Sequence, residues 1–469
     1  MIKMCVVGSG YVGLVAAACF AELGHDVTCV DNDSGRIGAL ERGDVPIHER
    51  FLPELLQRHR GKRLRFSSSL ASSVQASEVV FIAVGTPPSE SGETDLSYIE
   101  AVAREVGAVM ATNASGYKVI VEKSTVPATT CEGIRRVMEL NGASAASFEV
   151  ASNPEFLREG TAVTDFLYPD RIVIGAEGPR CIALLQKIYE PLTSGAYYGL
   201  KEAIGEGAPA APARLIVTSA KSAELIKHAS NAFLAMKISF INAVAAICEG
   251  VGADIDQVRQ GIGADSRIGS RFLNPGVGYG GSCFPKDIQA FRAVAQSAGY
   301  DFRLLEEVVR INDEQRRRFM AKLRSALWSL RGKRLGVLGL AFKGGTDDIR
   351  ESQAVAIIQL LLKEGCSIAA YDPAAMEKSR SSGVFENQDV SFSSDAYAAA
   401  RSADALLILT DWEEFAALDL ARLRAELKYP ILVDGRNLFR PESVTASGLI
   451  YVSMGRSEVP QKAAAIPGK

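Results

Sequence analysis

The stretch that decides the fold is Lys3-Met-Cys-Val-Val-Gly8-Ser-Gly10-Tyr-Val-Gly13, near the start of the printed chain. Its apolar first half predicts a buried strand over residues 3–7, and its three glycines predict a tight turn that opens a helix over 10–23. A second apolar run over 26–30 ends on Asp31. Strand, helix and strand in this order predict a βαβ unit, the building block of a parallel sheet.

The same turn has the chemistry of a dinucleotide site. Gly8, Gly10 and Gly13 lie between the predicted strand and helix, and Asp31 follows about 20 residues later. N–H groups at a helix N-terminus attract a pyrophosphate, while an acid at the end of the second strand accepts hydrogen bonds from ribose hydroxyls. Because that acid repels a 2′-phosphate, the pattern predicts NAD rather than NADP. A tight turn without a ligand is the alternative, which Asp31 disfavours.

Composition limits the class of protein. The chain has 469 residues, of which 47% are hydrophobic and 23% charged, which is globular and too long for a single core, so we expect two or three domains. Lys and Arg total 52 against 55 for Asp and Glu, a net charge of −3. We therefore expect no nucleic-acid partner and no membrane partner. The uncharged run 4–21 is long enough for a membrane span, but its glycines favour strand, turn and helix.

The eight cysteines and four histidines are scattered. They form no Cys-x-x-Cys pair and no zinc-type cluster, so the sequence predicts a reducing, cytoplasmic setting and no metal site.

Further along the chain, short apolar runs alternate with helical stretches. This alternation predicts a parallel sheet covered on both faces. The runs lie at 79–84, 118–121, 149–151 and 171–174, and the helical stretches include 97–110 and 129–141.

A long helix and a second βαβ pattern complete the predicted architecture. Residues 219–249 contain no Gly or Pro and have apolar residues at three-four spacing, so they predict one amphipathic helix that spans two domains or a subunit interface. After it, a strand over 334–338, a turn from Gly339, a helix over 354–363 and a strand over 367–371 repeat the opening pattern without its three-glycine fingerprint. The fold class is therefore α/β, with two Rossmann-like doubly wound parallel-sheet domains joined by a long central helix.

The domain limits follow from these elements and from a Gly-, Ala- and Pro-rich stretch over 195–213, which predicts a surface excursion. We expect a dinucleotide domain over 1–213, a central helical domain with a cysteine loop over 214–325, a second Rossmann-like domain over 326–456, and a loose tail over 457–469.

Three further motifs carry reactive groups. In Gly278-Tyr-Gly-Gly-Ser-Cys283-Phe-Pro-Lys286-Asp287, glycines permit close approach of a substrate and a nearby lysine stabilises thiolate, although a buried cysteine in a turn is the alternative. Lys227 and Asn231 project from one helix face, which could instead be a solvated face. The segment Asn153-Pro-Glu155-Phe-Leu follows a strand at the sheet edge where ligands bind, or else starts a helix.

Taken together, the motifs resemble those of the UDP-glucose/GDP-mannose dehydrogenase family, in order from residue 1 to about 455. The shared motifs are Gly8-x-Gly10-x-x-Gly13, Gly85-Thr-Pro-Pro, Lys123-Ser-Thr125-Val-Pro, Asn153-Pro-Glu155-Phe-Leu-Arg-Glu159-Gly, Pro169-Asp-Arg-Ile-Val-Ile-Gly175, Glu224-Leu-Ile-Lys227-His-Ala-Ser-Asn231, Gly280-Gly-Ser-Cys283-Phe-Pro-Lys286-Asp287 and Phe342-Lys343-x-x-Thr-Asp-Asp-x-Arg350.

The resemblance implies an NAD-dependent, four-electron oxidation of a primary alcohol to a carboxylate, with UDP-glucose as substrate. Cys283 would trap the aldehyde as a thiohemiacetal, which is oxidised to a thioester. Lys227 and Asp287 would assist deprotonation and stabilise oxyanions, with Asn231 as a donor. Thr125 and Glu155 would position the hydrolytic water.

The resemblance also implies two sets of binding residues. Arg267 would reach the neighbouring subunit's site, so we expect a homodimer or larger assembly. The implied NAD-binding residues are Gly8, Gly10, Tyr11, Val12, Gly13, Asp31, Arg36, Thr86, Thr125, Glu159, Lys286 and Arg350. The implied substrate-binding residues are Glu155, Phe156, Leu157, Lys227, Asn231, Arg267, Phe272, Gly280, Lys343 and Arg436, the last in Asp434-Gly-Arg-Asn.

Two other functions remain open from the sequence. A sibling enzyme would oxidise GDP-mannose or a UDP-N-acetylhexosamine by the same chemistry. An NAD-binding scaffold without activity would be expected to lack the nucleophile or the base, whereas Cys283, Lys227 and Asp287 are all present.

Overall fold

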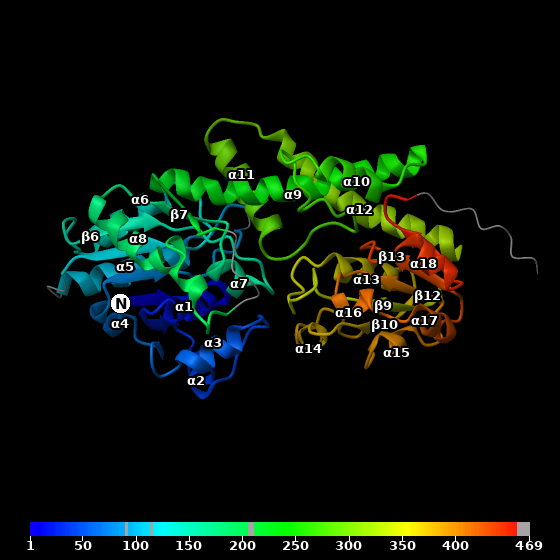
Figure 1. Ribbon diagram of the computed structural model, residues 1–469, viewed down its shortest axis with the longest axis horizontal. Helices are drawn as coiled ribbons and strands as arrows, with labels where there is room; N and C mark the ends of the chain where they lie inside the picture. Colours follow the sequence, from blue (N-terminus) through cyan, green and yellow to red (C-terminus); the bar gives the residue numbers. More distant parts are fainter. Residues whose placement is uncertain (90–91, 113–115, 205–210, 457–469) are drawn as a thin grey trace, which may run out of the picture. The chain divides into compact units, whose positions relative to one another are not determined.

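The structure is a computed structural model that describes residues 1–89, 92–112, 116–204 and 211–456 (Figure 1). The chain divides into two compact units. The first unit comprises Met1–Asn231 and Lys286–Asp301, and the second comprises Ala232–Pro285 and Phe302–Lys469.

The first unit is built on an eight-stranded sheet, drawn from blue to green in Figure 1. Its strand order is β3-β2-β1-β4-β5-β6-β7-β8, and the first six of these strands follow the Rossmann order 3-2-1-4-5-6. The strands are β1 (Lys3–Val7), β2 (Asp26–Val30), β3 (Leu64–Ser67), β4 (Val79–Ile82), β5 (Lys118–Glu122), β6 (Phe148–Ser152), β7 (Arg171–Gly175) and β8 (Arg214–Thr218).

This sheet is not parallel throughout, which corrects the sequence-based expectation. Strand β7 meets β6 in antiparallel register through Ser152 and Gly175, while β7 and β8 run parallel to each other. Helix α7 (Ala162–Leu167), the helix between β6 and β7, has six residues and is about 9 Å long. Its buried side chains join the core cluster that contains α1, so the connection does not recross the sheet, and β7 touches β6 only where both strands end.

The second unit repeats the Rossmann order without an exception. Its six strands are ordered β11-β10-β9-β12-β13-β14, and every pair is parallel. The prediction of two Rossmann-like sheets is confirmed. The strands are β9 (Arg334–Leu338), β10 (Ser367–Tyr371), β11 (Val390–Phe392), β12 (Ala405–Ile408), β13 (Ile431–Asp434) and β14 (Ile450–Ser453).

Most of the helices connect these strands, and α9 and α11 contribute residues to both units. Up to β8 they are α1 (Tyr11–Glu22), α2 (Ser34–Arg42), α3 (Leu52–His59), α4 (Leu70–Ala76), α5 (Ser97–Thr112), α6 (Thr130–Leu140), α7, α8 (Pro179–Thr193) and η1 (Ala196–Gly199). After β8 they are α9 (Ala220–Val251), α10 (Ile255–Gly263), α11 (Phe284–Ser297), α12 (Arg303–Leu327), α13 (Gln353–Lys363), α14 (Met376–Ser381), α15 (Ala396–Ala400), α16 (Glu413–Ala416), α17 (Leu420–Glu426) and α18 (Pro441–Ala446).

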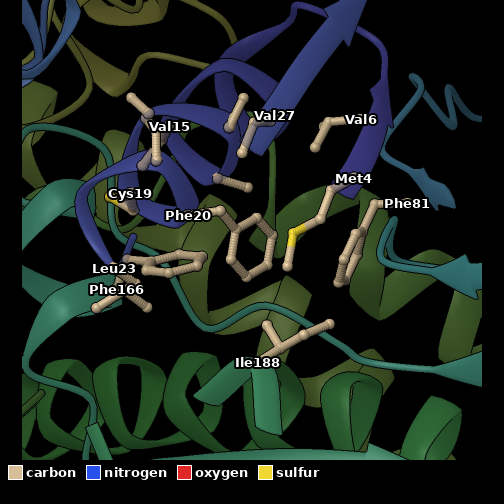
Figure 2. Close-up of a cluster of buried hydrophobic side chains, with 14 of the residues drawn as sticks. Met4, Val6, Val15, Cys19, Phe20, Leu23, Val27, Phe81, Phe166 and Ile188 are labelled. Carbon is tan, nitrogen blue, oxygen red and sulfur yellow. The ribbon is translucent and has the colours of Figure 1, made fainter. Parts of the chain in front are cut away.

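The first sheet is buried on both faces, because alternate residues of β1 enter different cores. Met4 and Val6 belong to one cluster of buried side chains, and Cys5 and Val7 belong to another. Figure 2 shows Met4 and Val6 beside Phe20, whose ring centroid lies 4.7 Å from that of Phe81 and 5.1 Å from that of Phe166. The uncharged N-terminal run is thus a strand, a turn and a core helix, as predicted.

Among the described residues, one helix is long and apolar enough to cross a membrane. It is α9, and 44% of its most apolar 18-residue window is buried. This helix coincides with the predicted central helix.

The domain limits differ from those expected. Strand β8 extends the first sheet past residue 213, and Lys286–Asp301 groups with the first unit rather than with the cysteine loop. Residues 205–210 of the predicted excursion and the predicted tail over 457–469 lie outside the described residues. The division into three domains stays a prediction.

Candidate active site

The glycine turn between β1 and α1 has the three roles that a dinucleotide requires. Gly8 has φ +103°, and a Cβ there would lie 2.5 Å from the Ala83 carbonyl oxygen. A Cβ on Gly13 would lie 1.8 Å from the Gly8 carbonyl oxygen, so glycine permits close packing of helix and strand. A Cβ on Gly10 would meet nothing within 4 Å. The helix N-terminus therefore faces open space, which fits NAD pyrophosphate at Gly10, Tyr11 and Val12.

Asp31, the predicted ribose-binding residue, lies directly after β2 and contacts the glycine turn. One carboxylate oxygen accepts from the Ser9 N–H and hydroxyl, both at 2.7 Å, and Arg36 Nη1 lies 3.9 Å from the same oxygen. Burial acts to raise the pKa of Asp31, but hydrogen bonds from Asp33 and Ser9 and the charge of Arg36 hold it below the usual value. Asp31 is therefore ionised at neutral pH. Ser9 was not among the predicted residues.

A buried carboxylate links this turn to the loop that follows β6. Glu49 accepts a hydrogen bond from the Tyr11 hydroxyl and another from the Gly160 N–H at 2.8 Å. The Gly160 N–H also lies 2.8 Å from the Tyr11 oxygen. Burial and the adjacent Glu49 raise the pKa of Tyr11, so its hydroxyl keeps its proton. The sequence gives no sign of Glu49, because its partners are remote in the chain. Glu159 directly precedes Gly160.

Lys227 and Glu155 form a buried ion pair. Lys227 Nζ lies 2.8 Å from Glu155 Oε1, and the two side chains are 5% and 6% exposed. Lys227 Nζ also lies 5.6 Å from the centroid of Phe156, which Arg171 covers at 3.6 Å. Leu157 donates its N–H to Glu155 Oε2 at 2.5 Å. The segment after β6 is therefore folded around a carboxylate, and the solvated-face interpretation of Lys227 is wrong.

Asp287 is the centre of a second buried cluster, which connects α9 and α11 within the first unit. Its carboxylate accepts a hydrogen bond from Asn231 Nδ2 at 2.6 Å and pairs with Lys286 Nζ at 2.8 Å. Lys286 Nζ lies 3.5 Å from the Thr86 hydroxyl, which donates to the Thr125 carbonyl at 3.1 Å. Predicted catalytic and cofactor residues from four separate motifs therefore form one chain of contacts.

Two buried ionisable groups that have no predicted role, Glu122 and Lys123, lie at the end of β5. Lys123 is 3% exposed and donates to Asn153 Oδ1 at 3.1 Å. Burial lowers the pKa of Lys123 to about 8, against the charges of Glu155 and Glu122. Burial and the neighbouring Glu224 raise the pKa of Glu122 well above its ordinary value. The removal of both side chains from water could not be read from the sequence.

Cys283 differs from every other cysteine of the chain. It is exposed, while the other seven are buried. Burial raises the pKa of the Cys5 thiol to about 12 and that of Cys366 to about 11, so both remain protonated thiols. Cys283 directly precedes α11, whose N-terminal end favours a negative charge. The interpretation of Cys283 as a buried structural cysteine is wrong.

The predicted substrate residues of the second unit lie around one turn. Arg436 donates to the carbonyl oxygens of Leu409 at 2.8 Å, Phe342 at 2.9 Å and Gly278 at 3.2 Å. A Cβ on Gly280 would lie 2.2 Å from the Glu351 carbonyl oxygen. Gly280 therefore packs closely against the backbone of its own unit. Arg436 holds the same turn through its hydrogen bond to Gly278. Lys343 Nζ lies 5.8 Å from the Phe342 ring centroid.

The other predicted binding residues of this unit are Arg267, Phe272 and Arg350. Arg267 is paired with Asp265 at 2.6 Å and its side chain is 88% exposed. Phe272 has φ +63° and its ring lies 6.3 Å from Phe284. Arg350 makes hydrogen bonds to both carboxylate oxygens of Asp348.

The fold and the glycine turn define the class as an NAD-dependent dehydrogenase of the Rossmann type. Three family models match the chain: the UDP-glucose/GDP-mannose dehydrogenase NAD binding domain over 2–193, the central domain over 221–314 and the UDP binding domain over 336–441. The chain belongs to the UDP-glucose/GDP-mannose dehydrogenase family.

Individual relatives are similar to this chain over nearly their full length. UDP-glucose 6-dehydrogenase of Rhizobium meliloti is 45% identical, over 97% of this chain and 100% of the relative. UDP-glucose 6-dehydrogenase TuaD of Bacillus subtilis is 44% identical, over 98% and 94%. The solved UDP-glucose dehydrogenase of Pyrobaculum islandicum is 38% identical with a TM-score of 0.84, over 96% of this chain and 97% of that one.

Proposed function

We propose that this enzyme oxidises UDP-glucose to UDP-glucuronate through a covalent intermediate on Cys283. The observation that carries the proposal is the exposure of this one cysteine, directly before the helix that bears Lys286 and Asp287. The names of the relatives support UDP-glucose over GDP-mannose and UDP-N-acetylhexosamines.

The first stage is loss of the hydroxyl proton and of a hydride from the sugar C6, which gives an aldehyde. Lys227 and Asp287 assist this step, because each lies in a buried cluster where charge is weakly screened. Asn231 holds the Asp287 carboxylate in place through the 2.6 Å hydrogen bond. NAD supplies the hydride acceptor when it is bound by the glycine turn and Asp31, and a four-electron oxidation consumes two molecules of it.

The second stage keeps the aldehyde on the enzyme. The Cys283 thiolate adds to the aldehyde carbon and forms a C–S bond, and the carbonyl oxygen takes up a proton to give a thiohemiacetal. Loss of a second hydride and of the hydroxyl proton gives a thioester. Water then adds to the thioester carbonyl, the C–S bond breaks, and the carboxylate and the thiol are released. Thr125 and Glu155 position that water.

The test is the stoichiometry of the reaction with a panel of nucleotide sugars. We expect two NADH per UDP-glucose, UDP-glucuronate as product, and no aldehyde captured by an added hydrazine. A ratio of one, or substantial trapped aldehyde, would refute the covalent retention of the intermediate. Faster turnover of GDP-mannose or a UDP-N-acetylhexosamine would refute the proposed substrate.

Self-association belongs to the same proposal. One line of exposed apolar side chains runs along α9 at intervals of seven and four residues, which is one face of a helix. A second copy of the chain would cover it, and Arg267 would then reach the neighbouring site. This use of α9 also accounts for its apolar sequence in a cytoplasmic enzyme that does not enter a membrane. The line consists of Phe233 (58% exposed), Phe240 (55%), Ile247 (62%) and Val251 (73%).

A further inference from the structure

Glu224 is a buried carboxylate that the proposed reaction does not use. It is 2% exposed, on the same helix as Lys227. Its two oxygens accept hydrogen bonds from the Thr129 and Cys131 N–H groups, both at 2.8 Å. Helix α6 begins at Thr130, and Thr129 makes no side-chain cap of its own. Glu224 therefore caps α6 from a different helix.

The residue that Glu224 holds has a strained backbone. Thr129 has φ +83°, in the left-handed region that a β-branched residue rarely adopts. Such a conformation persists only where the surrounding structure imposes it. The hydrogen bond from the Thr129 N–H to Glu224 is made at the strained residue itself. Removal of that bond would leave the turn free to relax.

The same face of α9 contacts residues 126–132 at two further points. His228 donates from Nε2 to the Val126 carbonyl at 2.8 Å, and burial lowers its pKa, so the imidazole is neutral. Lys221 Nζ pairs with Glu132 at 2.8 Å, with a side chain that is 57% exposed. Residues 221, 224 and 228 are three and four apart and lie on one helix face.

Thr125 directly precedes the residues 126–132 that α9 contacts. The Thr125 carbonyl is held from the other side by the Thr86 hydroxyl, at 3.1 Å. Relaxation of the Thr129 turn would displace Thr125, since only Val126, Pro127 and Ala128 separate them. A displacement of this kind affects a step that depends on the position of a water molecule more than it affects binding.

We propose that Glu224 is a positioning residue, which imposes the strained turn at Thr129 and thereby sets Thr125 for hydrolysis of the thioester. The inference rests on the proposed function, because it assigns Glu224 to one step of that reaction. We therefore expect that loss of the Glu224 carboxylate slows release of the product from Cys283, while hydride transfer from the alcohol continues.

The test is Glu224→Gln in the full-length enzyme. Glutamine keeps the shape but replaces one acceptor oxygen by an NH2 group, which cannot accept from an N–H. We expect kcat to fall at least about tenfold, with the KM values for NAD and UDP-glucose within about twofold. Intact-protein mass spectrometry of the quenched reaction should show the sugar nucleotide accumulated on Cys283. The rate of the first NADH burst should stay near that of the wild type.

A second variant separates positioning from folding. Glycine adopts φ near +83° without strain, so Thr129→Gly in the Glu224→Gln background should restore most of kcat and remove the adduct. If Glu224→Gln does not fold, the double variant still decides: wild-type-like turnover supports the proposal, and slow turnover with a stable fold overturns it. Lys221→Met is the matched control, since it removes an exposed contact on the same face, and its adduct lifetime should not change.

The outcomes distinguish this inference from the proposed function. If the wild type forms an adduct and Glu224→Gln leaves its lifetime unchanged, Glu224 is not a positioning residue for hydrolysis. Equal slowing of the NADH burst and of hydrolysis would also overturn the inference, because it would indicate general damage. If the wild type forms no adduct while Cys283→Ser turns over, the covalent mechanism itself fails.

Discussion

Asp31 and Asp372 occupy the same position in the two sheets, and each binds the backbone of its own glycine turn. Asp31 follows β2 and accepts from the Ser9 N–H at 2.7 Å, while Asp372 follows β10 and accepts from the Leu340 N–H at 2.7 Å. Asp372 is 0% exposed, and the same oxygen also accepts from Ala341 and from the Trp412 indole N–H. Its oxygens are therefore committed to protein donors. Asp31 is only partly buried, so of these two acids it is the accessible one.

Asp31 should control the choice of dinucleotide. Asp31→Ala removes the acceptor for the ribose hydroxyls and the charge that repels a 2′-phosphate, so the KM for NAD should rise about tenfold or more and the preference over NADP should shrink. Steady-state kinetics with both dinucleotides measures this. Asp372→Ala is the control for kinetics: it should lower stability through five lost hydrogen bonds without changing NAD preference. Equal use of NAD and NADP by the wild type would contradict the role of Asp31.

Cys283 should be indispensable for complete turnover. Cys283→Ser replaces the thiolate with a weaker nucleophile whose ester hydrolyses poorly, so steady-state kcat should fall at least about a thousandfold while UDP-glucose still binds. Calorimetric titration measures the binding and NADH formation measures the turnover. Cys366→Ser, at a buried thiol, serves as the comparison and should retain activity. Near-normal turnover of Cys283→Ser would exclude the covalent mechanism.

The Lys227–Glu155 pair should contribute to activity and stability in separable ways. Lys227→Met leaves the Glu155 carboxylate buried without its cation, which we expect to cost about 3–5 kcal/mol of unfolding free energy, and kcat should fall at least about a hundredfold. Adding Glu155→Gln should recover much of the stability, because no uncompensated charge remains. It should not recover kcat. Urea unfolding and NADH formation provide the two readouts, and recovery of activity in the double variant would show that Lys227 is only structural.

Glu122 should make the stability of the protein depend on pH. Its pKa is raised in the folded chain from an ordinary 4.5, so as pH rises above that value the unfolded chain releases this proton first. The Glu122 contribution to stability is present below pH 4.5 and is lost as pH rises toward the folded pKa. Glu122→Gln should therefore match the wild type near pH 4.5 and exceed it by about 1–2 kcal/mol at pH 8. Urea unfolding at both pH values checks this, and Glu139→Gln, at an exposed residue of α6, should show no such trend.

The apolar line on α9 should hold two copies of the chain together. Phe240→Asp places a charge in the middle of that line, so it should weaken self-association at least about a hundredfold. Sedimentation velocity over a range of concentrations measures the change. Leu140→Asp is the control, because Leu140 is 76% exposed but lies on α6. A wild type that sediments as a monomer at all concentrations would refute the proposed assembly.

The sequence by itself was sufficient to predict the structural elements that depend on residues close together in the chain. The turn at Gly8 and Gly13 depends on a φ value and close contacts that only glycine permits, and the apolar runs over 3–7, 26–30, 334–338 and 367–371 are strands of the two sheets. The spacing of Lys227 and Asn231 likewise placed both side chains on one face of α9. Such features are encoded within a few residues of one another, which is why a single sequence reveals them.

Only the tertiary structure decided features that join residues far apart in the chain. The reversal at β7 depends on the packing of α7 into the core beside α1. The contacts of Glu49 with Gly160, of Glu224 with Thr129 and of Asp287 with Asn231 depend on packing, and the lowered pKa of Lys123 depends on its removal from water. Burial and hydrogen bonding between distant segments have no local signature, because the same side chains in water would keep their ordinary pKa values and choose other partners.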